Sequence, residues 1–148
     1  MTIDEFWQLF LAKSNKDIAT KYLESFHFEL TEKLANELLE LVLSGKKKAT
    51  SSRWDSESSE TMPQVGDYSI VTDWDGNPRC IIETTAVTVL PFNEITFDIC
   101  KREGEDDNLE SWQKGHRNFF SEDGKISGYE FSETMLVLFE DFEMVFAI

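Results

Sequence analysis

The feature that most constrains the fold is a pair of strand-like segments in the middle of the chain, joined by a tight turn. Residues 67–74 read DYSIVTDW and residues 79–90 read RCIIETTAVTVL, and both runs are rich in β-branched side chains. The letters between them, DGNP, include Asp75-Gly76, a dipeptide typical of hairpin turns because glycine readily adopts a positive φ. The two segments therefore predict an antiparallel hairpin against which the rest of the chain must pack.

The chain closes with a second group of strand-like segments. Residues 135–142 read MLVLFEDF and residues 143–148 read EMVFAI. These apolar runs predict strands that complete a mostly antiparallel sheet with the central hairpin. Between the two groups, residues 91–108 predict a short helix that leads into an acidic loop, and the polar run at residues 121–130 predicts turns.

Helical spacing of apolar residues marks three other parts of the chain. Residues 1–30 carry two such sets, separated by a polar break: Phe6, Trp7, Phe10 and Leu11, then Ile18, Tyr22 and Leu23. A second helix begins after Thr31, an N-cap residue type, and Gly45 suits its C-terminal end. We expect its buried stripe to be Leu34, Leu38, Leu41 and Val42. A third helix follows Asn108 and carries Leu109, Trp112, His116 and Phe119 on one face.

Together these elements predict one α+β domain over residues 1–148. Its sheet is mostly antiparallel and can curl into a small barrel flanked by helices. Residues 1–30 are expected to form a helical N-terminal extension packed on that domain. A chain of 148 residues with 12 Phe and 4 Trp can bury a core of its own.

Charge and cysteine content narrow the functional classes. The 29 acidic residues outnumber the 14 basic ones and give a net charge of −15. Affinity for nucleic acid comes largely from Lys and Arg on phosphates, so an RNA role needs a local basic site or a ligand as small as a nucleoside.

Cys80 and Cys100 form no disulfide or metal-binding pattern. The chain shows no signal peptide and no apolar run near the roughly 18 residues of a membrane span, so we expect a cytoplasmic protein without membrane contact.

The first candidate site is the segment SGKKKATSS, residues 44–52. A run of lysines after a helix commonly lies in solvent, where it offsets the helix dipole. Here the hydroxyl residues Thr50, Ser51 and Ser52 follow at once, and a lysine beside a hydroxyl is one way to activate a nucleophile. A lysine of ordinary pKa ~10.4 is neutral at pH 7 at a cost of roughly 4.6 kcal/mol. A general-base lysine therefore requires deep burial, and otherwise the lysine serves as a cation that stabilises an oxyanion.

Two other segments carry candidate residues. The loop KREGEDDN places Glu103 and Glu105 in alternation, so that one carboxylate can point inward while the other faces solvent. Arg53 and Trp54 begin a long polar segment. Their side chains can stack on a nucleobase, or Trp54 can pack on the core within a surface loop.

Metal and nucleotide cofactors have no support in the sequence. His27 and His116 lie at no recognised metal-ligand spacing, and His116 is expected to be a packed or hydrogen-bonded residue. Neither a phosphate-binding glycine loop nor a G-x-S-x-G elbow is present. We therefore predict no metal and no cofactor.

Three stretches of the sequence resemble ASCH-domain proteins. They read LVLSGKKKATSSRW, MPQVGDYSIVTDWDGNPRCIIETTAVTVLPFNEIT and KREGEDDNLESWQKGHRNFF. The combination of G-x-K-x-x-T after a helix, V-G-D before a strand and E-G-E…W…H…F-F covers about residues 22–142. The resemblance implies a PUA-like fold, in which helices flank a small β-barrel, and a cleft associated with RNA or nucleosides.

The resemblance also implies an activity. Some small bacterial ASCH proteins are amidohydrolases that remove the acetyl group of N(4)-acetylcytidine with a Lys, a Thr and a Glu. The matching residues here are Lys47, Thr50 and, within E-G-E, Glu105, with Glu103 as the other choice. In the implied mechanism Thr50 attacks the acetyl carbonyl while Lys47 takes its proton, and the glutamate orients the pair or activates water.

Substrate contacts and rival functions follow from the same resemblance. We expect substrate-binding roles for Lys46, Ser52, Arg53, Trp54 and Glu103. The short amidohydrolases have an arginine at the position of Ser52, whereas this chain has its arginine one residue later and resembles a larger subgroup with an extra N-terminus. The partner is then a small nucleoside. The alternatives are an RNA-binding module or ribonuclease that uses the same basic cleft, or an interaction protein with a vestigial cleft. The sequence carries no signal of oligomeric state.

Overall fold

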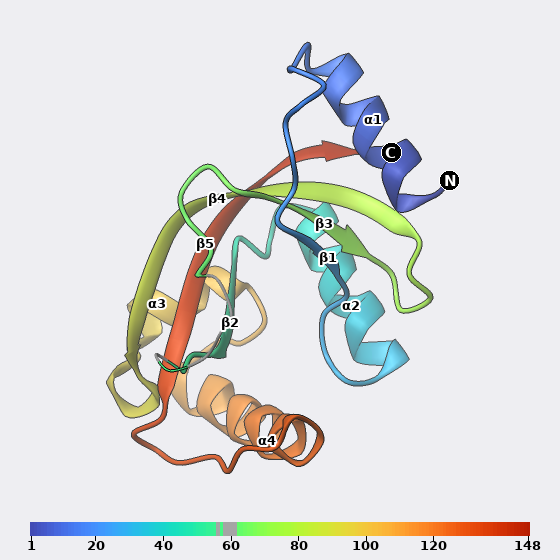
Figure 1. Ribbon diagram of the computed structural model, residues 1–148. Coiled ribbons are helices and arrows are strands. Elements are labelled where there is room, and N and C mark those ends of the chain that lie inside the picture. The colour runs from blue at the N-terminus through green and yellow to red at the C-terminus, as the bar shows by residue number, and fades with distance from the viewer. Residues whose placement is uncertain (56, 58–61) are drawn as a thin grey trace.

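The computed structural model describes residues 1–55, 57 and 62–148 and shows a curled, five-stranded mixed sheet with helices packed on it (Figure 1). The strand order is β1-β3-β4-β5-β2. The strands are β1 (Glu24–Phe26), β2 (Ala49–Arg53), β3 (Tyr68–Thr72), β4 (Pro78–Pro91) and β5 (Leu136–Ala147). The α-helices are α1 (Ile3–Lys13), α2 (Glu32–Leu43), α3 (Phe97–Cys100) and α4 (Leu109–Ser127), with 3-10 turns η1 (Phe92–Glu94) and η2 (Lys101–Glu103).

The predicted hairpin forms the centre of the sheet. β3 and β4 pair antiparallel, and Gly76 in the turn between them has φ 88°. β4 then pairs with β5 along its whole length, from Cys80 opposite Ala147 to Pro91 opposite Leu136. This ladder has two register shifts, and such bulges bend the strands of a sheet. The α+β class and the curled, barrel-like sheet are confirmed, with helices on its flanks.

The two edge strands differ in direction. β1 pairs with β3 in parallel, whereas β2 pairs with β5 antiparallel. In the described part of the chain, β2 is paired along one side only, so its other side is open to groups from neighbouring loops. This open edge is where the candidate site is built.

The N-terminal prediction is correct for α1 and wrong for the residues after it. Thr2 and Glu5 form a capping box, and the predicted apolar face of α1 is buried against Ile70 and Ile81 of the sheet. The second apolar set forms no helix, since residues 14–23 are turns and bends and Ile18 is 79% exposed. Asn15 has φ 55°, which ends the helical path, and the chain then adds β1 to the open edge of β3. Backbone pairing with the sheet thus replaced the second helix.

The second helix has the predicted ends but a different buried face. Thr31 caps α2 and Gly45 follows it with φ 81°. The buried residues are Ala35, Leu39 and Val42, of which Leu39 and Val42 pack with Phe28 and Phe142. Leu34 is 42% exposed and lines a groove together with Leu38 and Leu41, of which Leu38 also packs against the core. The prediction of the buried stripe was wrong at Leu34, because the neighbouring face of α2 is the one that packs on the sheet.

The last helix is longer than predicted. Asn108 caps α4 as expected, and Trp112 and Phe120 are buried between the helix, α3 and β5. The turns predicted for residues 121–130 are wrong up to Ser127, because the helix runs on until Gly128 ends it with φ 85°. Of the two glycines in this segment, Gly124 is helical and only Gly128 has the left-handed conformation. The extended α4 forms one wall of the groove.

Candidate functional site

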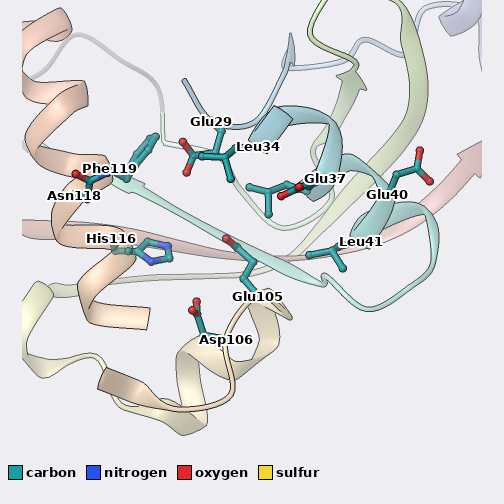
Figure 2. A pocket seen from close by; sticks show the side chains of 12 residues that line it. Glu29, Leu34, Glu37, Glu40, Leu41, Glu105, Asp106, His116, Asn118 and Phe119 are labelled. Atoms are coloured by element: carbon teal, nitrogen blue, oxygen red, sulfur yellow. The ribbon is translucent and has the colours of Figure 1, made fainter. Parts of the chain in front are cut away.

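A groove of about 600 Å³ lies between α2 and α4 (Figure 2). Leu34, Leu38 and Leu41 of α2 form one wall, and His116 and Phe119 of α4 form the other. A cavity of about 40 Å³ shares lining residues with the groove: Glu29, Leu38, Glu105, His116 and Phe119. Because of this shared lining, the small cavity is the floor of the groove. It also reaches Lys47, Thr50, Ser51 and Glu103.

Lys47 is the buried lysine of the three-lysine run. The chain after α2 is held by bonds from the Lys46 and Lys47 amides to Leu41 O and from the Lys48 amide to Arg102 O. This path leaves Lys46 and Lys48 exposed, while the Lys47 side chain is only 1% exposed. Burial therefore distinguishes the middle lysine from its two neighbours.

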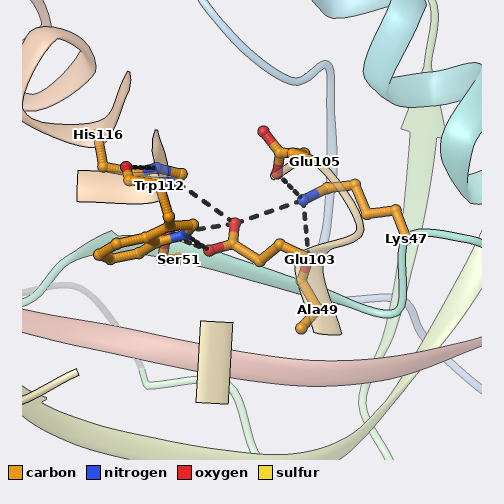
Figure 3. Close-up of polar contacts among 7 residues, drawn as sticks. All are labelled: Lys47, Ala49, Ser51, Glu103, Glu105, Trp112 and His116. Carbon is orange, nitrogen blue, oxygen red and sulfur yellow. Dashed lines mark hydrogen bonds and ion pairs between the residues drawn. The ribbon is translucent and has the colours of Figure 1, made fainter. Parts of the chain in front are cut away.

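The Lys47 ammonium has three acceptors around it (Figure 3). Nζ lies 2.6 Å from Glu105 Oε2, 2.8 Å from the Ala49 carbonyl oxygen and 3.4 Å from Glu103 Oε1. An ammonium has three N–H donors, and here each one has an acceptor. A neutral amine would donate only two such bonds, so the contacts fit the charged form of Lys47.

Glu103 lies beneath this pair and is fully enclosed. Its Oε2 accepts from Trp112 Nε1 at 2.6 Å and from Ser51 Oγ at 3.3 Å, and His116 Nε2 lies 3.5 Å from Oε1. Burial by itself would raise the pKa of Glu103, but the charges of Lys47 and His116 and the donors around it lower that pKa to about 2. The surrounding positive charges and donors therefore favour the ionised form of Glu103, which anchors the groups around it.

Glu105 is the carboxylate that faces the groove. Its side chain is 17% exposed and lines both the groove and its floor. Burial raises the pKa of Glu105 even though the Lys47 charge opposes the shift, and the nearby Glu103 charge raises it further. The two glutamates thus have opposite pKa shifts around one lysine, as acid–base pairs in active sites often do.

Gly104 allows both glutamates to reach Lys47. Its φ is 72°, and a Cβ built on it would collide with the Lys46 carbonyl. The η2 turn therefore packs directly on the backbone of the lysine run. Glu103 and Glu105 come to lie on the same ammonium although the sequence pattern suggested opposite directions for them.

His116 is a residue of this cluster that the sequence analysis did not select. It is hydrogen-bonded as predicted, with Nδ1 2.9 Å from the Trp112 carbonyl oxygen, and its ring stacks on Trp112 at 4.1 Å. Burial lowers the pKa of His116, but Glu103 and Glu105 outweigh this effect, so that the net shift is upward. The available signal was the i, i+4 spacing of Trp112 and His116 after E-G-E, which places both on one helix face.

Thr50 and Ser51 present their hydroxyls differently. Both residues line the floor of the groove from β2. The Ser51 hydroxyl donates to Glu103, whereas within the described part of the chain the Thr50 hydroxyl makes no hydrogen bond. Thr50 is thus the site hydroxyl that can engage a ligand without giving up a bond to the protein.

The other predicted contact residues lie outside this cluster. Lys46 is exposed and is not part of the groove lining. Ser52, Arg53 and Trp54 line a separate cavity of about 380 Å³ with Glu140 and Leu138. The Arg53 guanidinium lies 4.4 Å from the Tyr129 ring centroid and 3.7 Å from Asp55. The structure therefore brings together Lys47, Thr50, Glu103 and Glu105 but not these four, whose roles stay predictions.

Three side chains of the site have metal-ligand chemistry. Carboxylate and ring nitrogen atoms of Glu103, Glu105 and His116 lie within 4.8 Å of one another. Lys47 Nζ is within 3.4 Å of both carboxylates, so its ammonium already places a positive charge between them. A divalent cation would have to displace that ammonium, and the set does not fit a resident metal while Lys47 is in place.

Five of the side chains that line the groove are acidic. They are Glu29, Glu37, Glu40, Glu105 and Asp106. Among the described residues that line the groove there is no Lys or Arg, and Lys47 lies below on its floor. The basic cleft that the RNA-binding alternative requires is therefore not found at this groove.

The comparisons with known proteins agree with this fold. A family model described as the ASCH domain matches residues 24–146, which include every residue of the Lys47 cluster. The chain belongs to the ASCH-domain family. No curated protein matches the sequence significantly.

Solved structures are similar to this ASCH domain over nearly its whole length. An ASCH domain from Lactobacillus crispatus JV V101 is 42% identical, with a TM-score of 0.80, over 95% of this chain and 94% of that one. A protein from Enterococcus faecalis V583 is 32% identical, with a TM-score of 0.87, over 97% of this chain and 87% of that one. A mutant ASCH protein from Zymomonas mobilis, 13% identical with a TM-score of 0.53 over 84% of this chain and 74% of that one, shares the fold.

The family assignment also places the parts of the chain. The PUA-like, curled sheet of this ASCH domain lies within the matched range, whereas α1 precedes it. Across the residues that the structure describes, none of the helices combines the length and apolarity needed to cross a bilayer.

Proposed function

We propose that this ASCH domain is an amidohydrolase that removes an acyl group from a small nucleoside such as N(4)-acetylcytidine, without a metal. The observation that carries the proposal is the buried ion pair of Lys47 and Glu105 on the floor of the groove, which Thr50 with its available hydroxyl also lines. The same three residue types form the catalytic set of the small amidohydrolases that the sequence resembles.

The size of the groove suits such a substrate. Small-molecule sites typically have volumes of about 300–1,000 Å³ and mostly apolar walls. The groove measures about 600 Å³, and Leu34, Leu38, Leu41 and Phe119 supply apolar contacts for a base and its acyl group. The polar groups converge on the floor, where the amide carbonyl would lie.

Lys47 acts in this proposal as a cation. Two carboxylates and a carbonyl oxygen accept its hydrogen bonds, and nearby negative charge favours the charged form of an amine. A base role would require the neutral form, which is costly in this setting. Of the two roles left open by the sequence, electrostatic stabilisation of the oxyanion on the acyl carbonyl by the ammonium charge fits better, and the N–H bonded to Glu105 becomes free for the oxyanion when Glu105 takes up the Thr50 proton.

Thr50 supplies the nucleophile and Glu105 moves the proton. The Thr50 oxygen forms a bond to the acyl carbon and its proton passes to Glu105. The bond between the acyl carbon and the amine then breaks, and Glu105 returns the proton to the departing nitrogen. Water then gives a proton to Glu105 and attacks the acyl carbon of the Thr50 ester. The bond between that carbon and the Thr50 oxygen breaks, the carboxylic acid leaves, and Glu105 returns the proton to the Thr50 oxygen. The raised pKa of Glu105 makes its carboxylate a better proton acceptor than that of an ordinary glutamate.

Four further side chains position these groups: Glu103, Trp112, Ser51 and His116. Glu103 holds one side of Lys47, and its other contacts fix it to β2 and α4. Rigid support of this kind keeps a catalytic set in its productive geometry.

The test is turnover of N(4)-acetylcytidine by the purified chain, with cytidine and acetate measured over time. We expect release of both products, loss of at least about a hundredfold in kcat for Thr50→Ala, and partial activity for Thr50→Ser. Thr88→Ala, an exposed position on β4, is the matched control and should leave turnover unchanged. Cytidine release no faster than in buffer, or full activity of Thr50→Ala, would refute the proposal.

A further inference from the structure

The rim of the groove is negatively charged on both sides. Glu29, Glu37 and Glu40 come from the α2 side, and Glu105 and Asp106 come from the loop before α4 (Figure 2). Arg79 lies 3.8 Å from Glu40 and offsets part of that one charge. Glu105 is paired with Lys47 below it, whereas Glu29, Glu37 and Asp106 form no salt bridge with any residue that the structure describes.

The positive groups near the floor are already engaged by carboxylates. Lys47 Nζ is bonded to Glu105 and Glu103, and His116 Nε2 faces Glu103 at 3.5 Å. The Lys47 side chain is 1% exposed, so it lies too deep to meet a charge held at the rim. An anionic group on a ligand would therefore meet several carboxylates and no available cation.

The apolar wall sets the other requirement for a ligand. Leu34, Leu38, Leu41 and Phe119 face the same space as the carboxylates. Such a mixture favours a flat, apolar or weakly polar body with hydrogen-bond donors toward the rim. Hydroxyl and amino groups can donate to carboxylates, whereas a phosphate cannot.

We infer that the groove selects compounds without phosphate, so that the ligand is a free nucleoside or nucleobase and neither a nucleotide nor RNA. The inference rests on the proposed function for the choice of a nucleoside, and it adds that electrostatic repulsion at the rim excludes the phosphorylated forms. The reaction that supplies such a substrate must therefore release nucleosides from nucleotides or nucleic acid before this protein acts.

The experiment compares cytidine with cytidine 5′-monophosphate by calorimetric titration of the full chain, at about 20 mM and about 500 mM salt. Both probes lack the acyl group, so binding is measured apart from chemistry. We expect cytidine to bind at least about tenfold more tightly at low salt. The difference should shrink at high salt, because screening shortens the range of the repulsion to about 3–5 Å.

Charge-neutralising variants test where the discrimination arises. Glu37→Gln with Glu40→Gln removes two exposed rim charges and should improve the affinity for the monophosphate by at least about threefold, with little change for cytidine. Glu130→Gln with Glu143→Gln removes two exposed charges that do not line the groove, and is expected to leave the ratio unchanged.

The outcomes separate this inference from the proposed function. Turnover of N(4)-acetylcytidine together with equal binding of both probes overturns the inference and leaves the activity intact. Binding of cytidine alone, without turnover of the acetylated compound, supports the inference and removes the activity. Binding of neither probe, or an equal effect of the two double variants, overturns the inference.

Discussion

Lys47 Nζ lies 2.6 Å from Glu105 Oε2 at the boundary between the core and the groove. The two residues are 58 positions apart, and Gly104 permits the close packing of their loops. One partner is enclosed and the other reaches the open space. This ion pair places one lysine of an otherwise exposed run at a site that a ligand in the groove can reach.

Lys47→Met should destabilise the fold. The change leaves Glu103 enclosed without its closest cation, and breaking a buried ion pair costs about 3–5 kcal/mol. Chemical denaturation measures the loss. Lys46→Met, at an exposed position, is the control and should change stability by no more than about 0.5 kcal/mol. Adding Glu103→Gln to Lys47→Met should restore part of the loss, and an equal effect of the two lysine variants would contradict this account.

Gly104→Ala should be more harmful than the same change at another left-handed glycine. Alanine at a positive φ costs on the order of 1–2 kcal/mol, and at Gly104 the added Cβ also meets the Lys46 carbonyl. Gly128 has φ 85° but nothing within 4 Å of a Cβ, so Gly128→Ala reports the backbone cost alone. We expect a difference of at least about 1 kcal/mol in unfolding free energy, and similar values for the two variants would argue against a tight loop contact.

Trp112→Phe should weaken the anchor of Glu103. The substitution keeps an aromatic ring in the core but removes the Nε1 donor that lies 2.6 Å from Glu103. Loss of a hydrogen bond to a charged group costs roughly 1.5–3 kcal/mol. Trp54→Phe, outside the cluster, serves as the comparison. Stability of Trp112→Phe within about 0.5 kcal/mol of the parent protein would be inconsistent with this role.

The charge of His116 should make stability depend on pH. The pKa of His116 is raised in the folded state, so its contribution is fully present below its unfolded pKa of about 6.5 and is lost as pH rises through the higher folded value. Unfolding free energy measured from pH 5.5 to pH 9 should therefore fall more in the parent protein than in His116→Gln. Identical pH profiles would show that His116 does not gain a proton on folding.

A chelator should not affect the activity or the melting temperature. Lys47 supplies the positive charge between the two glutamates, so EDTA has no required ion to remove. Lys47→Ala, by contrast, opens the space among Glu103, Glu105 and His116 and should bind Zn²⁺ measurably more tightly than the parent protein. Activity and melting temperature measured with and without EDTA check the first expectation, and calorimetric titration with Zn²⁺ checks the second. Loss of activity in EDTA would count against the Lys47 assignment.

Local patterns in the sequence were sufficient for most of the fold. The hairpin around Gly76, the caps at Thr31 and Asn108 and the closing strand depend on neighbouring residues, so each could be predicted directly. The predictions were wrong where packing overrode local pattern. Residues 14–23 do not form the predicted second helix, and α4 continues through a segment rich in turn-forming residues.

The sequence by itself determined the chemical types at the site, since the G-x-K-x-x-T and E-G-E segments singled out Lys47, Thr50, Glu103 and Glu105. Only the tertiary structure decided which of them meet. The two glutamates reach one lysine because η2 packs on the end of α2, a contact between segments more than fifty residues apart. The tertiary structure also places His116 next to Glu103, and it places Arg53 and Trp54 at a separate cavity. Burial, and the distance between residues far apart in the sequence, depend on how the whole chain packs. Only this packing places one lysine of the run in a buried ion pair.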